Sequence, residues 1–404
     1  MEIRLDMYQT LALAVLVLML GSFLRRRIHF LEKFCIPAPV VGGLLFAIFT
    51  CICYSTGIAE FSFDDVLKEV CMVFFFTSVG FQANLKVLKK GGKSLAIFLA
   101  LVMALIISQN LLAIGLSKLL GLNPLIGMCT GSIPMVGGHG TAGAFGPVLE
   151  ALGLKDATTI AFAAATFGLV SGSFLGGPVG ELLIRRFHLK SDEDENGDEV
   201  PENRTEHEIE GDDAAAYLNM DRFMYAFGQL LLAMGLGTYV SQFFINIGLV
   251  FPGYIGAMLV AAVIRNISDM TGLFGCYQRE SEVLGGICLN VFLSCALMSL
   301  KLWQLADLAI PLIATLIVQV SIMGLFAYFV IFRVMGRNYE AAVMASGSCG
   351  FGLGATPNAI ANMNAMCERF GPAHTAYFVI PLIGAFVVDF LNASVLMVFM
   401  NILK

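Results

Sequence analysis

Long apolar stretches alternate with short polar ones along almost the whole chain. A membrane-spanning helix needs about 20 predominantly apolar residues. The pattern predicts an all-α polytopic membrane protein with ten transmembrane helices, near residues 8–24, 36–58, 70–85, 94–118, 157–182, 222–248, 251–267, 283–300, 305–333 and 374–403.

One strongly acidic stretch divides this pattern near its middle. Residues 191–213 read "SDEDENGDEVPENRTEHEIEGDD" and carry twelve of the thirty acidic residues, so we expect a solvated linker that does not fold alone. The predicted organisation is an N-terminal repeat over 1–190, the linker over 191–213 and a C-terminal repeat over 214–404.

The two halves resemble each other in the order of their elements. "APVVGG" opens the second span and "FPGYIG" opens the seventh, and each has a proline four residues before a glycine. Because each half has five spans, an odd number, the second copy inserts upside down. Inverted repeats of this kind are typical of secondary transporters.

Lys and Arg are distributed unevenly between the two sides of the predicted topology. Eighteen of them follow the odd-numbered spans, whereas the termini and the other loops hold six. Cytoplasmic loops carry an excess of Lys and Arg. We therefore predict a cytoplasmic linker and two extracytoplasmic termini.

Two apolar stretches contain too many helix-breaking residues to be ordinary spans. Residues 123–149 contain "GGHGTAGAFGP", and residues 339–365 contain "GSCGFGLGATPNAIANM". Non-helical backbone survives at membrane depth only where protein buries it or a wet cavity adjoins it. We predict two re-entrant hairpins, entering from opposite faces, whose tips meet near the bilayer midplane.

The residue types at these breaks favour an anion site. Thr356 suits an N-cap and Pro357 the first helical position, and Thr141 is expected to cap a helix in the first hairpin. Helix N-termini offer amides and a positive dipole end to anions. The predicted substrate-binding residues are Gly138, His139, Gly140, Thr141, Gly352, Gly354, Thr356, Pro357, Asn358 and Asn362.

Close helix packing is the alternative explanation of the glycines. It is the preferred one for Gly168, Gly172, Gly176 and Gly180, which recur every four residues. "GFGLG" also matches part of a nucleotide-binding glycine loop, but the strand–helix context of that motif is absent from this apolar stretch.

Asp389 lies well inside the last predicted span, where an unpaired carboxylate is costly. Asn392 is three residues on and shares its helical face. Carboxylate and amide oxygens suit Na⁺, so we predict that both residues bind sodium. Two alternatives remain for Asp389, namely a hydrogen bond to a neighbouring helix and contact with a substrate ammonium group.

For Gln109, Asn110 and Gln319 we expect interhelical hydrogen bonds.

Composition narrows the function class. Hydrophobic residues make up 58% of the 404 and charged residues 13%, and the cysteines include no CxxC pair. The histidines are scattered and only one aspartate is clearly buried, so neither zinc nor aspartyl chemistry is indicated, and we expect no enzyme and no cofactor. A channel is a third class, but it calls for a continuous polar lining. No basic footprint for nucleic acid is present.

Several motifs resemble the bacterial sodium/glutamate symporter family. They are spread over nearly the whole chain and comprise "IPAPVVGG" (36–43), "GGHGT" (137–141), "TFGLVSG" (166–172), "LMSLKLWQL" (297–305), "CGFGLGATPNAIANM" (349–363) and "ERFGP" (368–372). The resemblance implies a homodimeric secondary active carrier that imports glutamate with Na⁺ as coupling ion, by an elevator movement of the hairpin-bearing domain. The long acidic linker is a departure that lies outside these motifs. From the residues alone, a symporter of another small carboxylate such as citrate or malate, coupled to Na⁺ or H⁺, remains the alternative.

Overall fold

In the computed structural model, residues 2–34, 36–84, 92–191, 220–248 and 252–403 are described. The predicted linker therefore lies almost entirely outside the described residues. The first half contains α1 (Met7–Arg27), α2 (His29–Lys33), α3 (Ala38–Ser55), α4 (Val66–Gln82), α6 (Gly92–Leu119), α7 (Pro124–Thr130), α8 (Ser132–Met135), α9 (Gly138–Ala151) and α10 (Ala157–Phe187). The second half contains α13 (Met220–Asn246), α14 (Tyr254–Thr271), α15 (Gln278–Met298), η1 (Leu302–Leu308), α16 (Ala309–Phe326), η2 (Ala327–Ile331), α17 (Phe332–Val334), α18 (Tyr339–Leu353), α19 (Thr356–Phe370), α20 (His374–Leu382), η3 (Ile383–Val387) and α21 (Val388–Leu403).

Seven helices among the described residues are long and apolar enough to cross a bilayer. They are α1, α3, α6, α10, α13, α15 and the continuous stretch from α16 to α17. The chain is thus a multi-pass membrane protein. Three predicted spans correspond to α4, α14 and the α20–α21 segment, which fall outside this group of seven.

The last predicted span is not one regular helix. We expected residues 374–403 to be continuous, but the π-helical turn η3 separates α20 from α21. Pro381 lies just before this turn, and proline removes an intrahelical hydrogen bond, which is a common cause of such interruptions.

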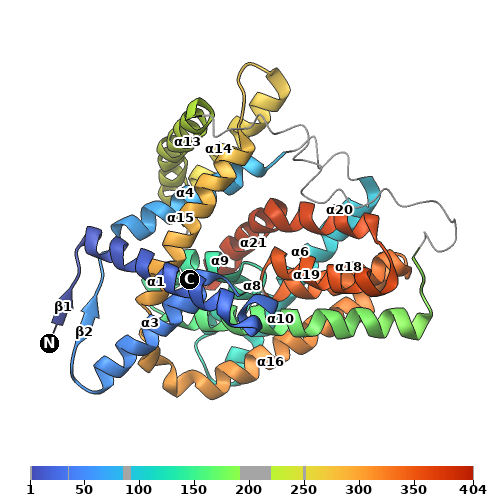
Figure 1. The fold of residues 1–404 in the computed structure, drawn as a ribbon, viewed down its shortest axis with the longest axis horizontal. Coiled ribbons are helices and arrows are strands. Elements are labelled where there is room, and N and C mark those ends of the chain that lie inside the picture. Colours follow the sequence, from blue (N-terminus) through green and yellow to red (C-terminus); the bar gives the residue numbers. More distant parts are fainter. Residues whose placement is uncertain (1, 35, 85–91, 192–219, 249–251, 404) are drawn as a thin grey trace.

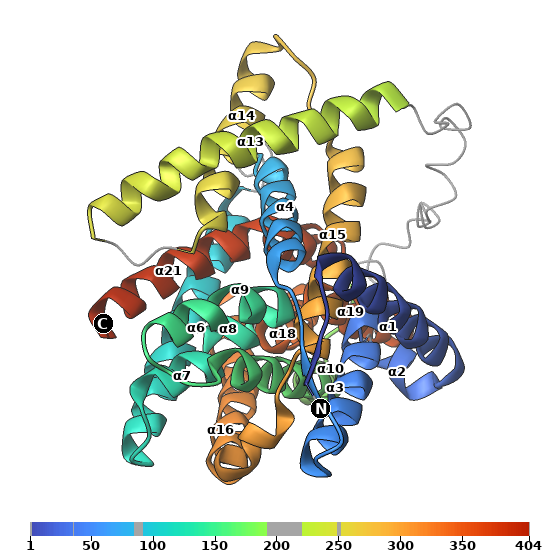
Figure 2. The same cartoon turned by 90° about the vertical axis from the view of Figure 1, so that its left-hand side faces the viewer.

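The helices form two bundles, each of which draws on both halves of the sequence (Figures 1 and 2). In the first bundle α1, α3 and α4 pack with α13, α14 and α15. In the second, α6 to α10 pack with α16 to α21, and α10 runs through its centre against α9, α18 and α19. The bundles meet where α15 contacts α9 and where η3 contacts α4.

One helix pair in each half of the chain crosses at paired glycines. In the first half Gly42 of α3 lies against Gly21 of α1, and in the second Gly256 of α14 lies against Gly237 of α13. A side chain at any of these four positions would collide with the facing backbone. Small residues permit this close approach of helices in membranes.

One small element departs from the expected all-α fold. Strands β1 (Glu2–Arg4) and β2 (Glu60–Ser62) pair in parallel at the end of the molecule where the chain begins. Three residues per strand are too few to produce a recognisable alternating pattern. Asp6 then caps α1 in a capping box with Gln9.

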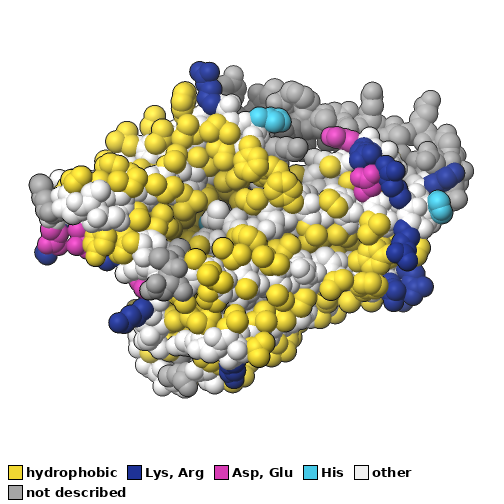
Figure 3. Space-filling view, turned by 90° about the horizontal axis from the view of Figure 1, so that it is seen from below, with side chains coloured by type: hydrophobic (Ala, Val, Ile, Leu, Met, Phe, Trp, Pro, Cys, Tyr) yellow, Lys and Arg dark blue, Asp and Glu magenta, His cyan; other side chains and the backbone are white. Residues whose placement is uncertain are grey.

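The outer surface carries a broad apolar area over the long helices (Figure 3). Lys and Arg side chains gather at one end of this view, the end at which α10 finishes in Figure 1. Arg185 and Arg186 are exposed there. Glu181 pairs with Arg185 at 2.8 Å and with Arg369 of α19 at 3.1 Å, so this carboxylate joins two helices.

Candidate binding site where two broken helices meet

The two glycine-rich breaks lie against each other inside the second bundle. Gly138 opens α9, and Gly354 follows the last residue of α18. A Cβ atom at residue 138 would lie 2.6 Å from the carbonyl oxygen of Gly354. Gly138 also has φ +60°, a conformation that glycine adopts freely. The sequence motifs "GGHGT" and "CGFGLG" are therefore in contact.

The first break consists of two interruptions. The helix α7 ends at Thr130, the short α8 follows Gly131, and α9 begins after Gly137. Ser132 at the start of α8 accepts a hydrogen bond from Asn110 of α6 at 2.7 Å, and its hydroxyl donates to Oδ1 of Asn392 of α21 at 2.6 Å. These bonds anchor the break to two helices.

The second break differs from the expected capping arrangement. The helix α19 does begin at Thr356, but Ala355 is its N-cap residue and Thr356 makes no capping hydrogen bond. The Thr356 hydroxyl instead donates to the carbonyl oxygen of Gly384 at 2.8 Å. The physical reason is η3, because a π-helical turn presents a backbone carbonyl that a hydroxyl can satisfy.

Thr141 does not cap a helix either. It lies within the first turn of α9, where its backbone N–H bonds the carbonyl of Gly137, and Gly137 is the N-cap residue. His139 is buried beside it, and its Nε2 lies 3.0 Å from the hydroxyl of Thr166 on α10. That hydroxyl donates to the carbonyl of Phe162, so Nε2 of His139 acts as the donor to Thr166.

Asn358 and Asn362 point toward α10 rather than toward the first break. Nδ2 of Asn358 donates to the carbonyl of Leu169 at 2.8 Å, and Nδ2 of Asn362 donates to that of Gly172 at 3.1 Å. Pro357 stands in the first turn of the same helix. The predicted packing role of the α10 glycines is confirmed, because all four contact α18 or α19: Gly168, Gly172, Gly176 and Gly180.

The remaining predicted glycines face neighbouring helices. A Cβ at Gly352 would lie 2.8 Å from Sδ of Met323, and one at Gly354 would lie 2.7 Å from Cα of Leu169. Gly140 faces the other bundle, where a Cβ would meet the ring of Phe75 at 3.5 Å. Close packing therefore accounts for the first two positions, and Gly140 lies at the junction of the bundles.

Asp389 is partly buried near the start of α21, two residues after η3, the turn that contacts α4 of the first bundle. Among the described residues none hydrogen-bonds or ion-pairs with its carboxylate. Its charge lies within electrostatic range of Tyr254 on α14, whose ring stacks on Phe76 of α4 at 3.9 Å. Asn392, one turn further, bonds both the hydroxyl and the carbonyl of Ser132.

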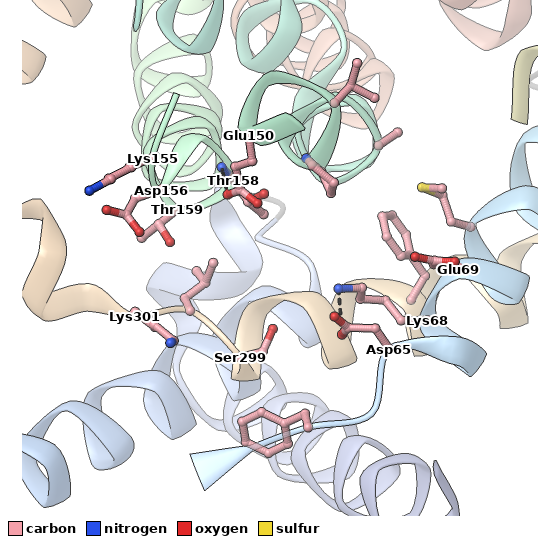
Figure 4. A pocket seen from close by; sticks show the side chains of 18 of the residues that line it. Asp65, Lys68, Glu69, Glu150, Lys155, Asp156, Thr158, Thr159, Ser299 and Lys301 are labelled. Carbon is pink, nitrogen blue, oxygen red and sulfur yellow. Dashed lines mark hydrogen bonds and ion pairs between the residues drawn. The ribbon is translucent and has the colours of Figure 1, made fainter. Parts of the chain in front are cut away.

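A cavity of about 1070 Å³ opens between the two bundles, next to α9 (Figure 4). Glu150, Thr158 and Thr159 line it from the second bundle, and Lys68 and Ser299 line it from the first. In Figure 4 these two groups face each other across the opening. Lys68 pairs with Asp65 at 2.7 Å.

Sequence reasoning missed the partners that fix the site. Ser132, Thr166 and Gly384 contact predicted site residues, yet nothing in their own segments indicates which distant residue each one meets. Thr166 belongs to "TFGLVSG", and its repeated small residues were a usable signal for a helix that packs on the breaks.

Comparison with known proteins identifies the family of the chain. The family described as "Sodium/glutamate symporter" matches residues 3–372. The sodium/glutamate symporter of Escherichia coli strain K12 is 40% identical over 398 residues, and that of Haemophilus influenzae is 41% identical over 401 residues; in both cases 98% of each chain is covered. A protein of the same name from Shigella flexneri is 40% identical over the same coverage. The chain belongs to the sodium/glutamate symporter family.

Proposed function

We propose that this protein is a secondary active carrier that takes up glutamate together with Na⁺ across the bacterial inner membrane. The observation that carries the proposal is the meeting of two broken helices, Gly138 beside Gly354, inside a multi-pass membrane protein. The relatives that match it over nearly their full length are named sodium/glutamate symporters.

The substrate site lies where the two breaks meet. Gly138, His139 and Gly140 in the first turn of α9 and Thr356 at the start of α19 supply backbone amides for carboxylates, and both helix N-termini add a positive dipole end. Thr141, Pro357 and Asn358 complete these two turns. The cavity of Figure 4, whose lining on α9 begins at Gly143, is the proposed approach toward these turns.

Asp389 and Asn392 are the proposed ligands of a coupling Na⁺. The carboxylate of Asp389 has no protein partner among the described residues, and a charge at such a depth needs one. Oδ1 of Asn392 accepts from Ser132 and keeps a second lone pair.

The movement that carries substrate is an elevator displacement of the second bundle along the first. Two features support this proposal: each bundle combines corresponding helices of both halves, and equivalent pairs cross at Gly21–Gly42 and Gly237–Gly256. This is the arrangement expected of two inverted repeats, 1–190 and 214–404, with re-entrant hairpins at α7–α9 and α18–α19. The first bundle is the scaffold and forms the homodimer.

The orientation follows from the charges. The end of the molecule with exposed Arg185 and Arg186 is cytoplasmic, and the termini lie on the opposite, extracytoplasmic side.

Competition for uptake tests the substrate. Labelled glutamate is taken up by cells that produce the protein, in Na⁺ medium, with unlabelled glutamate, citrate and malate as competitors. We expect saturable uptake that unlabelled glutamate suppresses and the other carboxylates leave largely intact. Stronger suppression by citrate or malate would assign the carrier to those substrates.

A further inference from the structure

Two glutamines hold the broken hairpins in a reciprocal way. Nε2 of Gln109 on α6 donates to the carbonyl oxygen of Gly352, in the last turn of α18, at 2.8 Å. Nε2 of Gln319 on α16 donates to the carbonyl of Thr130, the last residue of α7, at 3.2 Å, and to the backbone carbonyl of Gln109 at 2.9 Å. Each glutamine therefore binds the hairpin of the opposite half, and the two residues contact each other.

These hydrogen bonds fix which way each side-chain amide faces. All three acceptors are carbonyl oxygens, which cannot donate, so each amide nitrogen must face them and each Oε1 must face away. Gln109 is 1% exposed and Gln319 is fully buried. Within the described part of the chain, Oε1 of neither residue has a hydrogen-bond donor. A buried acceptor without a donor is costly, so two such atoms at one helix crossing call for an explanation.

The depth of the pair matches that of the breaks. Gln109 lies ten residues before the end of α6, and Gln319 lies ten residues after the start of α16. At 1.5 Å per residue each is about 15 Å from its helix end, which is half of a hydrocarbon core of about 30 Å.

We propose that Oε1 of Gln109 and Oε1 of Gln319 accept a small monovalent cationic group, either Na⁺ or the ammonium group of an amino-acid substrate. Neutral amide oxygens are suitable ligands for Na⁺ and suitable acceptors for an ammonium donor. The inference rests on the proposed function, which supplies both groups. The site is separate from Asp389 and Asn392, which lie on α21.

The same hydrogen bonds also couple binding of the cationic group to the conformation of the two helix breaks. The same two amides bond the last turn of α7 and of α18, so a cation that fixes them holds both hairpin arms. Binding of the cation is then linked to binding at the hairpin tips, and linkage of this kind is reciprocal.

The test uses purified full-length protein and the variants Gln109→Met and Gln319→Met, which keep length and remove the amide. Two quantities are measured: the Na⁺ concentration that half-maximally stabilises the protein without glutamate, and the affinity for glutamate and for glutarate, which lacks the amine, at saturating Na⁺. Gln109→Glu is the replacement variant if a methionine variant does not fold.

Gln229→Met is the matched control. Nε2 of Gln229 on α13 also donates to a glycine carbonyl, that of Gly275, at 2.7 Å, and no described residue donates a hydrogen bond to its buried Oε1. It belongs to the first bundle, away from the breaks. We expect its Na⁺ midpoint and glutamate affinity to equal those of the wild type.

If the group is Na⁺, both methionine variants raise the Na⁺ midpoint at least tenfold in the absence of glutamate. For Gln109→Glu that midpoint becomes pH-dependent, since protons compete with Na⁺ for the carboxylate. If the group is the ammonium, the midpoint is unchanged and glutamate affinity falls at least tenfold, whereas glutarate binding does not change.

The inference would be overturned if the methionine variants had the same Na⁺ midpoint and the same glutamate affinity as Gln229→Met. It would also be overturned if Gln109→Glu showed a pH-independent Na⁺ midpoint together with unchanged glutamate affinity. Failure of the proposed function looks different, because the wild-type protein itself would then show neither a Na⁺ midpoint nor glutamate binding.

Discussion

The backbone of Gly138 approaches that of Gly354 so closely that a Cβ at residue 138 would lie 2.6 Å from the carbonyl oxygen of Gly354. The two residues are far apart in the sequence and each belongs to a different half of the chain. Their contact joins the first turn of α9 to the end of α18, so the two breaks lie side by side.

Gly138→Ala should abolish glutamate uptake. The methyl group would collide with the Gly354 carbonyl and would also strain a residue with φ +60°. Gly121→Ala separates these effects, because Gly121 has φ +71° but no atom within 4 Å of its Cβ position. We expect the control to lower thermal stability slightly, by about 1 kcal/mol, and to keep uptake. Equal uptake by both variants would show that contact between the tips is unnecessary.

The position of the breaks could be predicted from the sequence, but their local geometry could not. Glycine, proline and threonine in an apolar stretch mark a place where a helix must stop, and α19 does begin at Thr356. The prediction that Thr356 caps α19 was wrong because its hydroxyl bonds a competing acceptor, the Gly384 carbonyl, which η3 exposes. A π-helical turn has no distinct sequence pattern.

The sequence also could not predict which residues from distant segments hydrogen-bond to each other. Gln109 and Gln319 were expected to make interhelical hydrogen bonds, and they do. That each reaches the hairpin of the other half depends on how the helices cross, which hydropathy does not determine. The β1–β2 pair was missed because its strands are too short for a periodic signal.

Asp389→Asn should weaken Na⁺ binding and, through it, glutamate binding. The substitution keeps size and removes the charge, and linkage between two ligands is reciprocal. Glutamate affinity is measured against Na⁺ concentration in wild type and variant, and raising Na⁺ should recover part of the lost affinity. An unchanged Na⁺ midpoint would return Asp389 to an ammonium-pairing or packing role.

Ser132→Ala should destabilise the protein by about 1–3 kcal/mol. It leaves Asn110 and Asn392 without their shared buried hydroxyl. Ser294→Ala is the control, since Ser294 is also fully buried but its hydroxyl has no hydrogen-bond partner among the described residues. Thermal unfolding in detergent compares the two. A loss of stability in Ser294→Ala as large as in Ser132→Ala would mean that the hydroxyl network does not anchor the first break.

The topology prediction concerns the two sides of the membrane. With eighteen Lys and Arg after odd-numbered spans and six elsewhere, residue 404 should be extracytoplasmic and residue 200 cytoplasmic. Reporter fusions at these two positions give the answer. Signals from the same side would contradict the orientation and the inverted repeat together.

Uptake by purified protein in liposomes tests the central claim most directly. Labelled glutamate is supplied outside, with an inward Na⁺ gradient or with equal Na⁺ on both sides. We predict that the gradient drives saturable accumulation above the external concentration, and that dissipating the gradient reduces glutamate to equilibration. Accumulation that is indifferent to the Na⁺ gradient, or flux that does not saturate, would contradict sodium-coupled transport by this protein.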